Sequence, residues 1–287
     1  MRKHQIKSFC KINLSLRVIK KLKNGYHNVA SLITFCDLYD LISIYISKKK
    51  EDEIVFSGKF KKGINKKLNT LTNLLLILRK NNLLKKKFFK ISIKKNVPHG
   101  SGLGGGSANA ANLLNFLNLK MNLRLGNKII NKIAHKIGFD VESLLKRKNT
   151  LFTGNKRKLI RLKYSLNLCV LIVYPNLICS TKKIYKKNKS FTSSKLKMNF
   201  NTNSKEKLIK LLKNEKNDLE KIIVKTYPIV GKVINVIGKQ KGCYFSRVTG
   251  SGSACFGIFS NMKTANNAKR LIKQKFPNFW TVASKTI

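Results

Sequence analysis

Pro98-His99-Gly100-Ser101-Gly102-Leu103-Gly104-Gly105-Gly106-Ser107-Ala108-Asn109-Ala110-Ala111 is the stretch that decides the fold of this 287-residue chain. Five of the 17 glycines lie between Gly100 and Gly106. Apolar residues alternate before the stretch, at 89, 91 and 93, and predict a strand. After it, apolar residues recur on one face, which predicts a helix. A glycine loop at a helix start directs backbone N–H groups and a positive helix end at one point, which favours a bound phosphate.

Other interpretations of this loop are possible. It could be a simple strand-to-helix connector. A P-loop requires Gly, four residues and then Gly-Lys-Ser or Gly-Lys-Thr, which the chain lacks. Gly100, Gly102 and Gly105 match Gly-x-Gly-x-x-Gly, but a dinucleotide site also needs an acidic residue about 20 residues later. No Asp or Glu lies between Glu53 and Asp140, so the sequence disfavours a Rossmann fold.

The chain is strongly basic. It has 61 Lys+Arg against 11 Asp+Glu, a formal net charge of +50. Such a charge is typical of proteins that bind nucleic acid or anionic membranes. The lysines are spread over the whole chain, however, and Asn, Ile and Phe are also frequent, so a compositional bias is a sufficient explanation. We therefore expect no specific nucleic-acid partner, although a basic nucleic-acid-binding protein stays open as an alternative.

The cysteine and apolar patterns predict reduced cysteine thiols and no segment that spans a membrane. The six Cys and four His are dispersed without a zinc-ligand spacing, so no protein-bound metal site is expected. The beginning of the chain lacks the apolar run of a signal peptide. The longest apolar stretches, residues 74–78 and 168–174, are too short to span a bilayer. We expect a cytoplasmic protein with no membrane partner, and the sequence leaves open whether it is a monomer or a weak dimer.

Two candidate substrate-binding features lie near the N-terminus. Alternation over residues 10–18 predicts a strand with Lys11 and Asn13 on one face, where lysine is more often a solvated residue than a functional one. Tyr26 and His27 follow a predicted turn at Asn24-Gly25. An exposed Tyr-His pair suits contact with a flat ring, but the tyrosine could equally anchor the turn to the core. Further strands are expected at residues 41–46 and 54–56, and a helix at 71–78.

Asp140 is a candidate catalytic residue because acids are so rare in this chain. Asp140 and Glu142 are the only carboxylates between Glu53 and Glu206. A helix is predicted over residues 129–137, ending at Gly138. Asp140 could then act as the N-cap of a helix over 141–145, or as a catalytic base, or as both.

The second half of the chain reads as an α+β sandwich. We expect domains over residues 1–153 and 154–287. Residues 168–174 predict a buried strand, and the polar run 187–207 predicts a mobile insertion. A helix opens at Asn217-Asp218-Leu219-Glu220. Residues 243–259 predict two strands joined by a turn at 249–253, followed by a helix over 265–276 and a strand over 280–284.

Three motifs in this order resemble those of the GHMP kinases, the superfamily of galactokinase, homoserine, mevalonate and phosphomevalonate kinases. They are the strand of Lys11, the glycine loop and the turn at 249–253. The sequence is most similar to the members that phosphorylate 4-diphosphocytidyl-2-C-methyl-D-erythritol, on the additional evidence of Gly25-Tyr26-His27, Asp140-Val141 and Asn217-Asp218-Leu219-Glu220. The resemblance implies a two-domain fold, with a ribosomal-protein-S5-like N-terminal domain and a ferredoxin-like C-terminal sandwich.

The resemblance also implies a function. It predicts ATP-dependent transfer of phosphate to the 2-hydroxyl of that cytidine diphosphate substrate, in isoprenoid precursor synthesis, with Asp140 as base and Lys11 as its charge partner. ATP and Mg²⁺ are implied, and another small-molecule kinase of the superfamily stays open as an alternative. The implied ATP-binding residues are Pro98, Gly100, Ser101, Gly102, Leu103, Gly104, Gly105, Gly106 and Ser107. The implied substrate-binding residues are Asn13, Tyr26, His27, Thr181, Tyr185, Thr249, Gly250 and Ser251.

Three positions depart from the pattern of the resembling kinases. Ile33 stands where an aromatic residue near the cytosine is usual. Ala108 replaces a second serine, which removes one hydroxyl from the nucleotide site. Tyr185 replaces a phenylalanine and should still stack on a base. None of these changes removes the expected base or lysine, so we expect an active enzyme.

Overall fold

The computed structural model describes residues 3–23, 25–153, 158–193, 200, 202 and 204–287. The chain forms two compact units. Unit 1 comprises Met1–Cys10, Leu38–His99 and Gly104–Arg147, and unit 2 comprises Lys11–Asp37, Gly100–Leu103 and Lys148–Ile287. The predicted domain boundary between residues 153 and 154 stays a prediction. Each compact unit consists of several separate chain segments, so the two units do not test a single boundary in the sequence.

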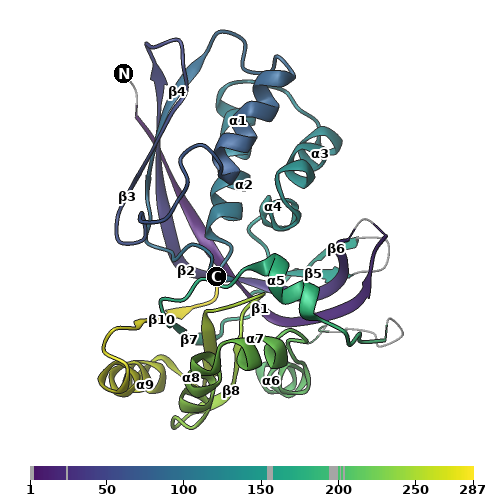
Figure 1. Cartoon of the computed structure of the whole chain (residues 1–287), viewed down its shortest axis with the longest axis vertical. Helices are drawn as coiled ribbons and strands as arrows, with labels where there is room; N and C mark the ends of the chain where they lie inside the picture. The colour runs from purple at the N-terminus through teal and green to yellow at the C-terminus, as the bar shows by residue number, and fades with distance from the viewer. Residues whose placement is uncertain (1–2, 24, 154–157, 194–199, 201, 203) are drawn as a thin grey trace. The chain divides into compact units, whose positions relative to one another are not determined.

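Unit 1 is a sheet with helices on one face (Figure 1). Its strands run in the order β3-β4-β2, with β3 parallel and β2 antiparallel to β4. Ile91 of β4 lies between Ile44 and Ile54 of the two neighbouring strands. The elements are β2 (His27–Ser47), which belongs to unit 1 from Leu38 onward, β3 (Glu53–Ser57), β4 (Phe88–Lys94), α1 (Thr70–Lys80), α2 (Gly105–Lys120), α3 (Asn127–Ile137) and α4 (Phe139–Leu144).

Local sequence signals fix where α1 and α2 begin. Asn69 caps α1, because its side chain accepts hydrogen bonds from the N–H groups of Leu71 and Thr72. The helix α2 starts differently: its N-cap, Gly104, has φ 68°, a left-handed conformation that favours glycine. The buried face of α2 includes Ala110, Leu113 and Leu117, as the spacing of apolar residues predicts.

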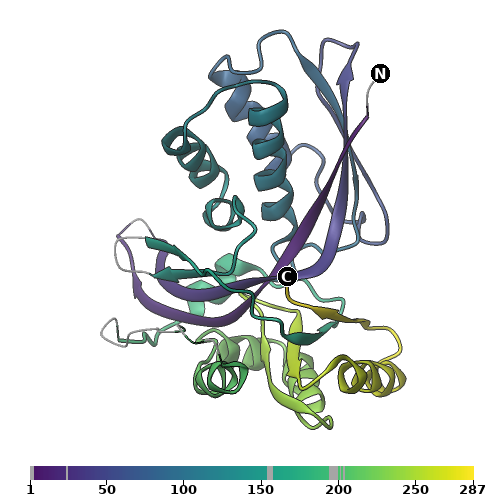
Figure 2. The same ribbon diagram turned by 180° about the vertical axis from the view of Figure 1, so that it is seen from behind.

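Unit 2 contains an antiparallel sheet of order β10-β7-β9-β8 with helices on one face (Figure 2). Leu171 of β7, Val233 of α8 and Ile272 of α9 meet in its fully buried core. These elements are β7 (Cys169–Tyr174), α7 (Glu220–Thr226), α8 (Pro228–Gly238), β8 (Cys243–Val248), β9 (Cys255–Phe259), α9 (Met262–Lys275) and β10 (Trp280–Lys285). The predicted strand–turn–strand, the following helix and the last strand are confirmed.

A second group of strands completes unit 2. Residues 31–33 of β2 pair antiparallel with residues 150–152 of β5, and β5 pairs with β6. Leu16 of β1 forms a bridge with Asn217. The remaining elements are β1 (His4–Lys21), which belongs to unit 2 from Lys11 onward, β5 (Thr150–Thr153), β6 (Lys158–Arg161), α5 (Thr181–Lys187) and α6 (Lys205–Asn214). Among the helices of the described residues, none has the length and apolarity needed to cross a bilayer.

The structure refines three expectations from the sequence. The strand expected at 41–46 is confirmed as the last part of β2, which begins at His27. Residues 29–36 of β2 are buried without alternation, so the sequence lacks a period of two there. Asp140 is not an N-cap, because α4 begins at Phe139 and its N-cap is Gly138. Of the polar run 187–207, α5 ends at Lys187 and α6 begins at Lys205, and the described residues between them carry no helix or strand, so the mobile insertion stays a prediction. Residues 194–199, 201 and 203 of that run lie outside the described residues.

Candidate active site

The first half of the glycine loop, residues 100–103, lies in unit 2 against the turn at 249–254. The N–H of Ala254 donates to the carbonyl of Ser101 at 2.9 Å, and the N–H of Lys11 donates to the carbonyl of Leu103 at 3.0 Å. Gly102 has φ 85°, and a Cβ added there would lie 2.2 Å from the carbonyl oxygen of Thr249. Only glycine tolerates both conditions, so this contact fixes the path of the loop.

Lys11 and Asn13 lie in a buried polar cluster of unit 2. Lys11 Nζ donates to Asn13 Oδ1 at 2.5 Å, and the N–H of Asn13 donates to Thr249 Oγ1 at 2.9 Å. Asn13 Nδ2 donates to Ser31 Oγ at 2.7 Å. Lys11 is 3% exposed and Asn13 is 4% exposed, so the solvated-lysine interpretation is wrong. Burying an ammonium costs free energy unless it is hydrogen-bonded. Lysine is therefore mostly found on protein surfaces, and a buried lysine such as Lys11 is unusual.

The turn at 249–253 brings further predicted residues to the same cluster. Gly250 has φ 57°, and a Cβ added there would lie 3.2 Å from Asn13 Oδ1 and 3.5 Å from Lys11 Nζ. Asn217 Nδ2 supports the turn by donating to the Gly250 carbonyl at 2.8 Å. Thr181 Oγ1 and Ser251 Oγ lie 2.7 Å apart, within hydrogen-bond distance. Unit 2 therefore holds the hydroxyls and the amide for which the resemblance implies substrate contacts, and the ammonium of Lys11, for which it implies a catalytic role.

Aromatic side chains form another predicted group in unit 2. The ring centroids of His27 and Tyr185 lie 5.0 Å apart with an interplanar angle of 39°. Tyr26 is 71% exposed, so it does not anchor the turn to the core. Burial, and secondarily the charge of Lys21, lowers the pKa of His27 below its ordinary value. The imidazole is therefore neutral at pH 7, with one nitrogen that donates and one that accepts a hydrogen bond.

The second half of the loop, residues 104–107, lies in unit 1 and opens α2. Gly105 packs closely: a Cβ added there would lie 3.2 Å from Val97 Cγ1. The carbonyl of Gly106 accepts a hydrogen bond from Thr70 Oγ1 at 2.8 Å. Pro98 is buried, and Ser107 is half-buried in the first turn. The first N–H groups of a helix have no partner within it, so this helix start offers donors to an anion.

A buried ion pair lies behind this helix start, and sequence reasoning missed it. Lys95 Nζ contacts Asp40 Oδ2, and the side chains are 2% and 0% exposed. Asp40 also accepts hydrogen bonds from the N–H groups of Asn96 and Val97 and from Asn109 Nδ2 on α2. A Cβ added at Gly105 would lie 3.4 Å from Lys95 Nζ. The available signal was the scarcity of carboxylates, since Asp40 is one of only 11 acidic residues.

Asp140 is half-buried in the first turn of α4, in unit 1. Its own backbone carbonyl accepts a hydrogen bond from Ser143 Oγ at 2.8 Å, which holds the turn that carries it. Asp140 therefore belongs to unit 1, whereas Lys11, its expected charge partner, belongs to unit 2.

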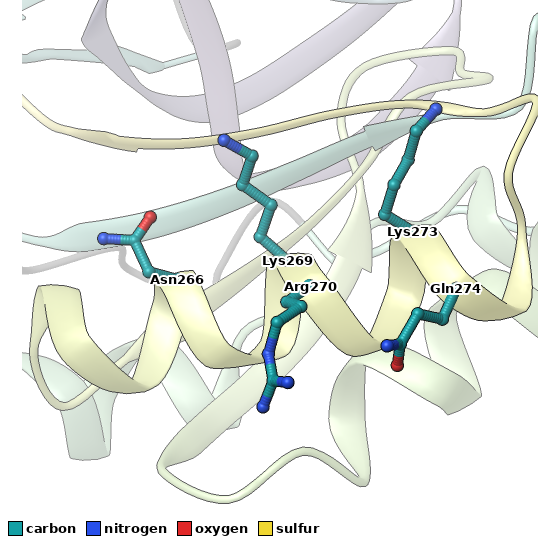
Figure 3. Close-up of a pocket in the computed structure, with 5 residues that line it drawn as sticks. All are labelled: Asn266, Lys269, Arg270, Lys273 and Gln274. Atoms are coloured by element: carbon teal, nitrogen blue, oxygen red, sulfur yellow. The ribbon is translucent and has the colours of Figure 1, made fainter.

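A shallow hollow on α9, with a volume of about 400 Å³, contains none of the predicted site residues. Figure 3 shows that the side chains lining it all come from this one helix, and that Lys269 and Lys273 extend in the same direction while Arg270 points the other way. A single helix face without converging groups from other elements is a poor ligand site. The candidate active site therefore remains at the glycine loop and the residues around it, and not at this hollow.

Comparison with known proteins decides the family. Models described as "GHMP kinases N terminal domain" and "GHMP kinases C terminal" match residues 69–144 and 199–278. A 4-diphosphocytidyl-2-C-methyl-D-erythritol kinase of Pelagibacter ubique (strain HTCC1062) is 39% identical over 289 residues, covering 100% of both chains. The chain belongs to the 4-diphosphocytidyl-2-C-methyl-D-erythritol kinase family. This confirms the resemblance on which the sequence-based assignment rested.

Solved structures confirm the fold of this kinase family for the chain. A crystal structure of 4-(cytidine 5'-diphospho)-2C-methyl-D-erythritol kinase superposes with a TM-score of 0.75 at 22% identity, covering 99% of each chain. The homoserine kinase from Cytophaga hutchinsonii superposes with a TM-score of 0.73 at 17% identity, covering 100% of this chain and 95% of that one. The expected α+β GHMP kinase fold is therefore correct.

Proposed function

We propose that this protein transfers the terminal phosphate of ATP to the 2-hydroxyl of 4-diphosphocytidyl-2-C-methyl-D-erythritol, as a step of isoprenoid precursor synthesis. The end-to-end match to a relative bearing that kinase name carries the proposal. It is supported by the cluster of Lys11, Asn13 and Thr249 beside the glycine loop in unit 2. We further propose that the enzyme works in the cytoplasm, where ATP is available.

In the proposed reaction the glycine loop holds the phosphates. The N–H groups at the start of α2 and the left-handed glycines at 100, 102 and 104 let the backbone approach an anion closely. Phosphoryl transfer depends mainly on positioning and on charge stabilisation. Lys11 supplies a positive charge, and its hydrogen bond to Asn13 fixes the ammonium in one orientation.

Asp140 is the proposed base. Its carboxylate accepts the proton of the 2-hydroxyl while that oxygen forms a bond to the γ-phosphorus and ADP leaves. A carboxylate is a weak base for an alcohol, but it suffices when the transition state is loose and the proton moves late. Asn13, Thr181, Thr249, Gly250 and Ser251 are the proposed contacts to the polar part of the substrate, and Tyr26, His27 and Tyr185 those to cytosine.

Magnesium is expected to accompany ATP, and the side chains of this site fit an ion that the protein itself holds with few ligands. In the part of the chain that the structure describes, no three His, Cys, Asp or Glu side chains gather where a metal could bind. Mg²⁺ commonly takes most of its ligands from phosphates and water. The hydroxyl of Ser107, in the first turn of α2, is the side chain suited to add one ligand. The bound ion would neutralise phosphate charge.

A substrate panel tests the function. The purified protein should form ADP from ATP only with the cytidyl substrate, and not with mevalonate, homoserine or galactose. Turnover with one of these other alcohols, and none with the cytidyl compound, would replace the proposal with another kinase of the superfamily. Tight, salt-sensitive binding to DNA or RNA without turnover would favour the nucleic-acid alternative.

The proposed base is tested by Asp140→Asn, which keeps the shape of the side chain but removes its charge. We expect kcat to fall by about 10²- to 10⁴-fold, the usual contribution of a general base. Glu142→Gln is the matched control on the same helix, because Glu142 faces His135 at 3.5 Å and has no proposed catalytic role. Full turnover of the Asp140→Asn protein, or an equal loss in both variants, would contradict this role.

A further inference from the structure

Phe191 is a large apolar side chain in a polar run, and it has no role in the function proposed so far. It is 47% exposed. Single exposed hydrophobic residues are common and need no explanation by themselves. Phe191 differs because its ring lies 6.5 Å from the ring of His27, centroid to centroid, with an interplanar angle of only 21°. Both residues belong to unit 2.

The backbone next to Phe191 is held in place. The N–H of Thr192 donates to the carbonyl of Val18 on β1 at 2.8 Å, and Thr192 Oγ1 donates to Asp218 Oδ2 at 2.6 Å. The same Asp218 oxygen accepts from the N–H of Val18 at 2.8 Å. The exposed ring is therefore attached to an anchored segment. An exposed ring on an anchored backbone loses little conformational freedom when it binds a ligand.

The orientation of the ring decides what it can contact. Hydrogen bonds to the nitrogens of a neutral imidazole lie near the plane of its ring, so a base that pairs with the His27 edge lies close to that plane. A ring tilted by 21° from the plane can present its face to such a base, whereas the 39° tilt of Tyr185 presents a more oblique contact. Offset stacking of aromatic rings spans centroid distances of about 4.5 to 7 Å.

We propose that Phe191 stacks on the pyrimidine ring of the substrate and is a specificity-determining residue of the cytidyl subsite. This inference rests on the proposed function, because it takes the cytidyl compound as the substrate. It gives residues 188–193 a role that their polar composition did not indicate. The interaction recognises a flat base and does not involve the transferred phosphate.

Steady-state kinetics of Phe191→Ala tests the proposal. Stacking of one base on an aromatic side chain is worth about 1 to 3 kcal/mol, so the KM for the cytidyl substrate should rise about 5- to 100-fold. The KM for ATP and kcat at saturation should stay near the wild-type values. Phe191→Tyr should restore the wild-type KM because it restores the ring. Leu271→Ala on α9 is the matched control, since Leu271 is 46% exposed and lies outside the proposed site.

Calorimetric titration with cytidine diphosphate, under saturating ADP to block the nucleotide site, separates this inference from the function. Wild type should bind, and Phe191→Ala should bind about 5- to 100-fold more weakly. If wild type turns over and Phe191→Ala keeps both its KM and its affinity within twofold, the inference is wrong and the function stands. If wild type does not turn over, a Phe191-dependent affinity still supports the base subsite. Absence of cytidine diphosphate binding by wild type, or equal rises in both KM values, overturns the inference.

Discussion

The two halves of the glycine-rich loop are held by different physical means. Residues 100–103, in unit 2, are fixed by backbone hydrogen bonds and by the close approach of Gly102 to the Thr249 carbonyl. Residues 104–107, in unit 1, open a helix that packs on the buried pair Lys95–Asp40. One half depends on backbone shape and the other on a buried charge pair. Substitutions that disturb residues 100–103 should therefore weaken nucleotide binding, whereas those that disturb the charge pair behind residues 104–107 should lower the stability of the fold.

The largest effect is expected in unit 1, for Lys95→Met. Removing one partner of a buried ion pair leaves an uncompensated charge on Asp40, so the free energy of unfolding should fall by about 3 to 5 kcal/mol. Urea denaturation followed by circular dichroism measures this change. The double variant Lys95→Met/Asp40→Asn should recover part of the loss, because no unpaired charge remains. A Lys95→Met protein as stable as wild type would show that the pair does not support the helix start.

A smaller effect, on activity, is expected for Gly102→Ala in unit 2. The added Cβ would meet the Thr249 carbonyl at 2.2 Å and the left-handed φ costs about 1 to 2 kcal/mol, so the loop must shift. A shift of about 1 Å can cost up to about 100-fold, and we expect kcat/KM for ATP to fall by roughly 10- to 100-fold.

Gly106→Ala is the corresponding substitution in the other half of the loop. Gly106 lies in α2, and its added Cβ would lie 3.4 Å from Thr70 Oγ1, which is an ordinary contact. Its loss should be smaller than that of Gly102→Ala. Gly126→Ala is the control, since a Cβ there meets nothing within 4 Å. Equal losses for the Gly102 and Gly106 variants would show that the two halves of the loop do not differ as described.

The smallest effect is expected from pH, through His27 in unit 2. Its pKa is lowered in the folded protein, first by burial and then by Lys21, so the ring stays neutral until the pH falls below its ordinary value of about 6.5. Protonation then removes the accepting nitrogen, and the KM for the cytidyl substrate should rise about 2- to 10-fold, the value of one neutral hydrogen bond. The KM of His27→Asn should lack this rise, and a persistent rise in that variant would assign it to another group.

The same lowered pKa has a consequence for stability. Because the unfolded chain binds the proton at a higher pH than the folded chain does, the His27 contribution disfavours folding as the pH falls below about 6.5. Above that pH the ring is neutral in both states and contributes no pH dependence. Unfolding of wild type and His27→Asn, compared between about pH 5 and pH 7.5, checks this sign.

Periodic and glycine-rich segments were predictable from the sequence. The alternation over residues 10–18 lies within β1, and the apolar spacing after the loop corresponds to α2. Acid scarcity made Asp140 stand out, but its place in the helix was not predictable, because a shift of one residue decides between cap and first turn. The buried start of β2 gave no alternating pattern, and the polar loop of Phe191 gave no sign that Thr192 would anchor it.

The sequence by itself determined the strand–glycine loop–helix unit, the order of the kinase motifs and the scarcity of carboxylates, because these depend on residues that are neighbours in the chain. Only the tertiary structure decided that Lys11 is buried with Asn13 and Thr249, that Lys95 pairs with Asp40, and that the Phe191 ring stacks at 21° to the His27 ring. In a chain this rich in lysine, residue type does not distinguish a buried ammonium from a solvated one. Burial and pairing depend on contacts between residues up to 236 positions apart, which local patterns do not encode.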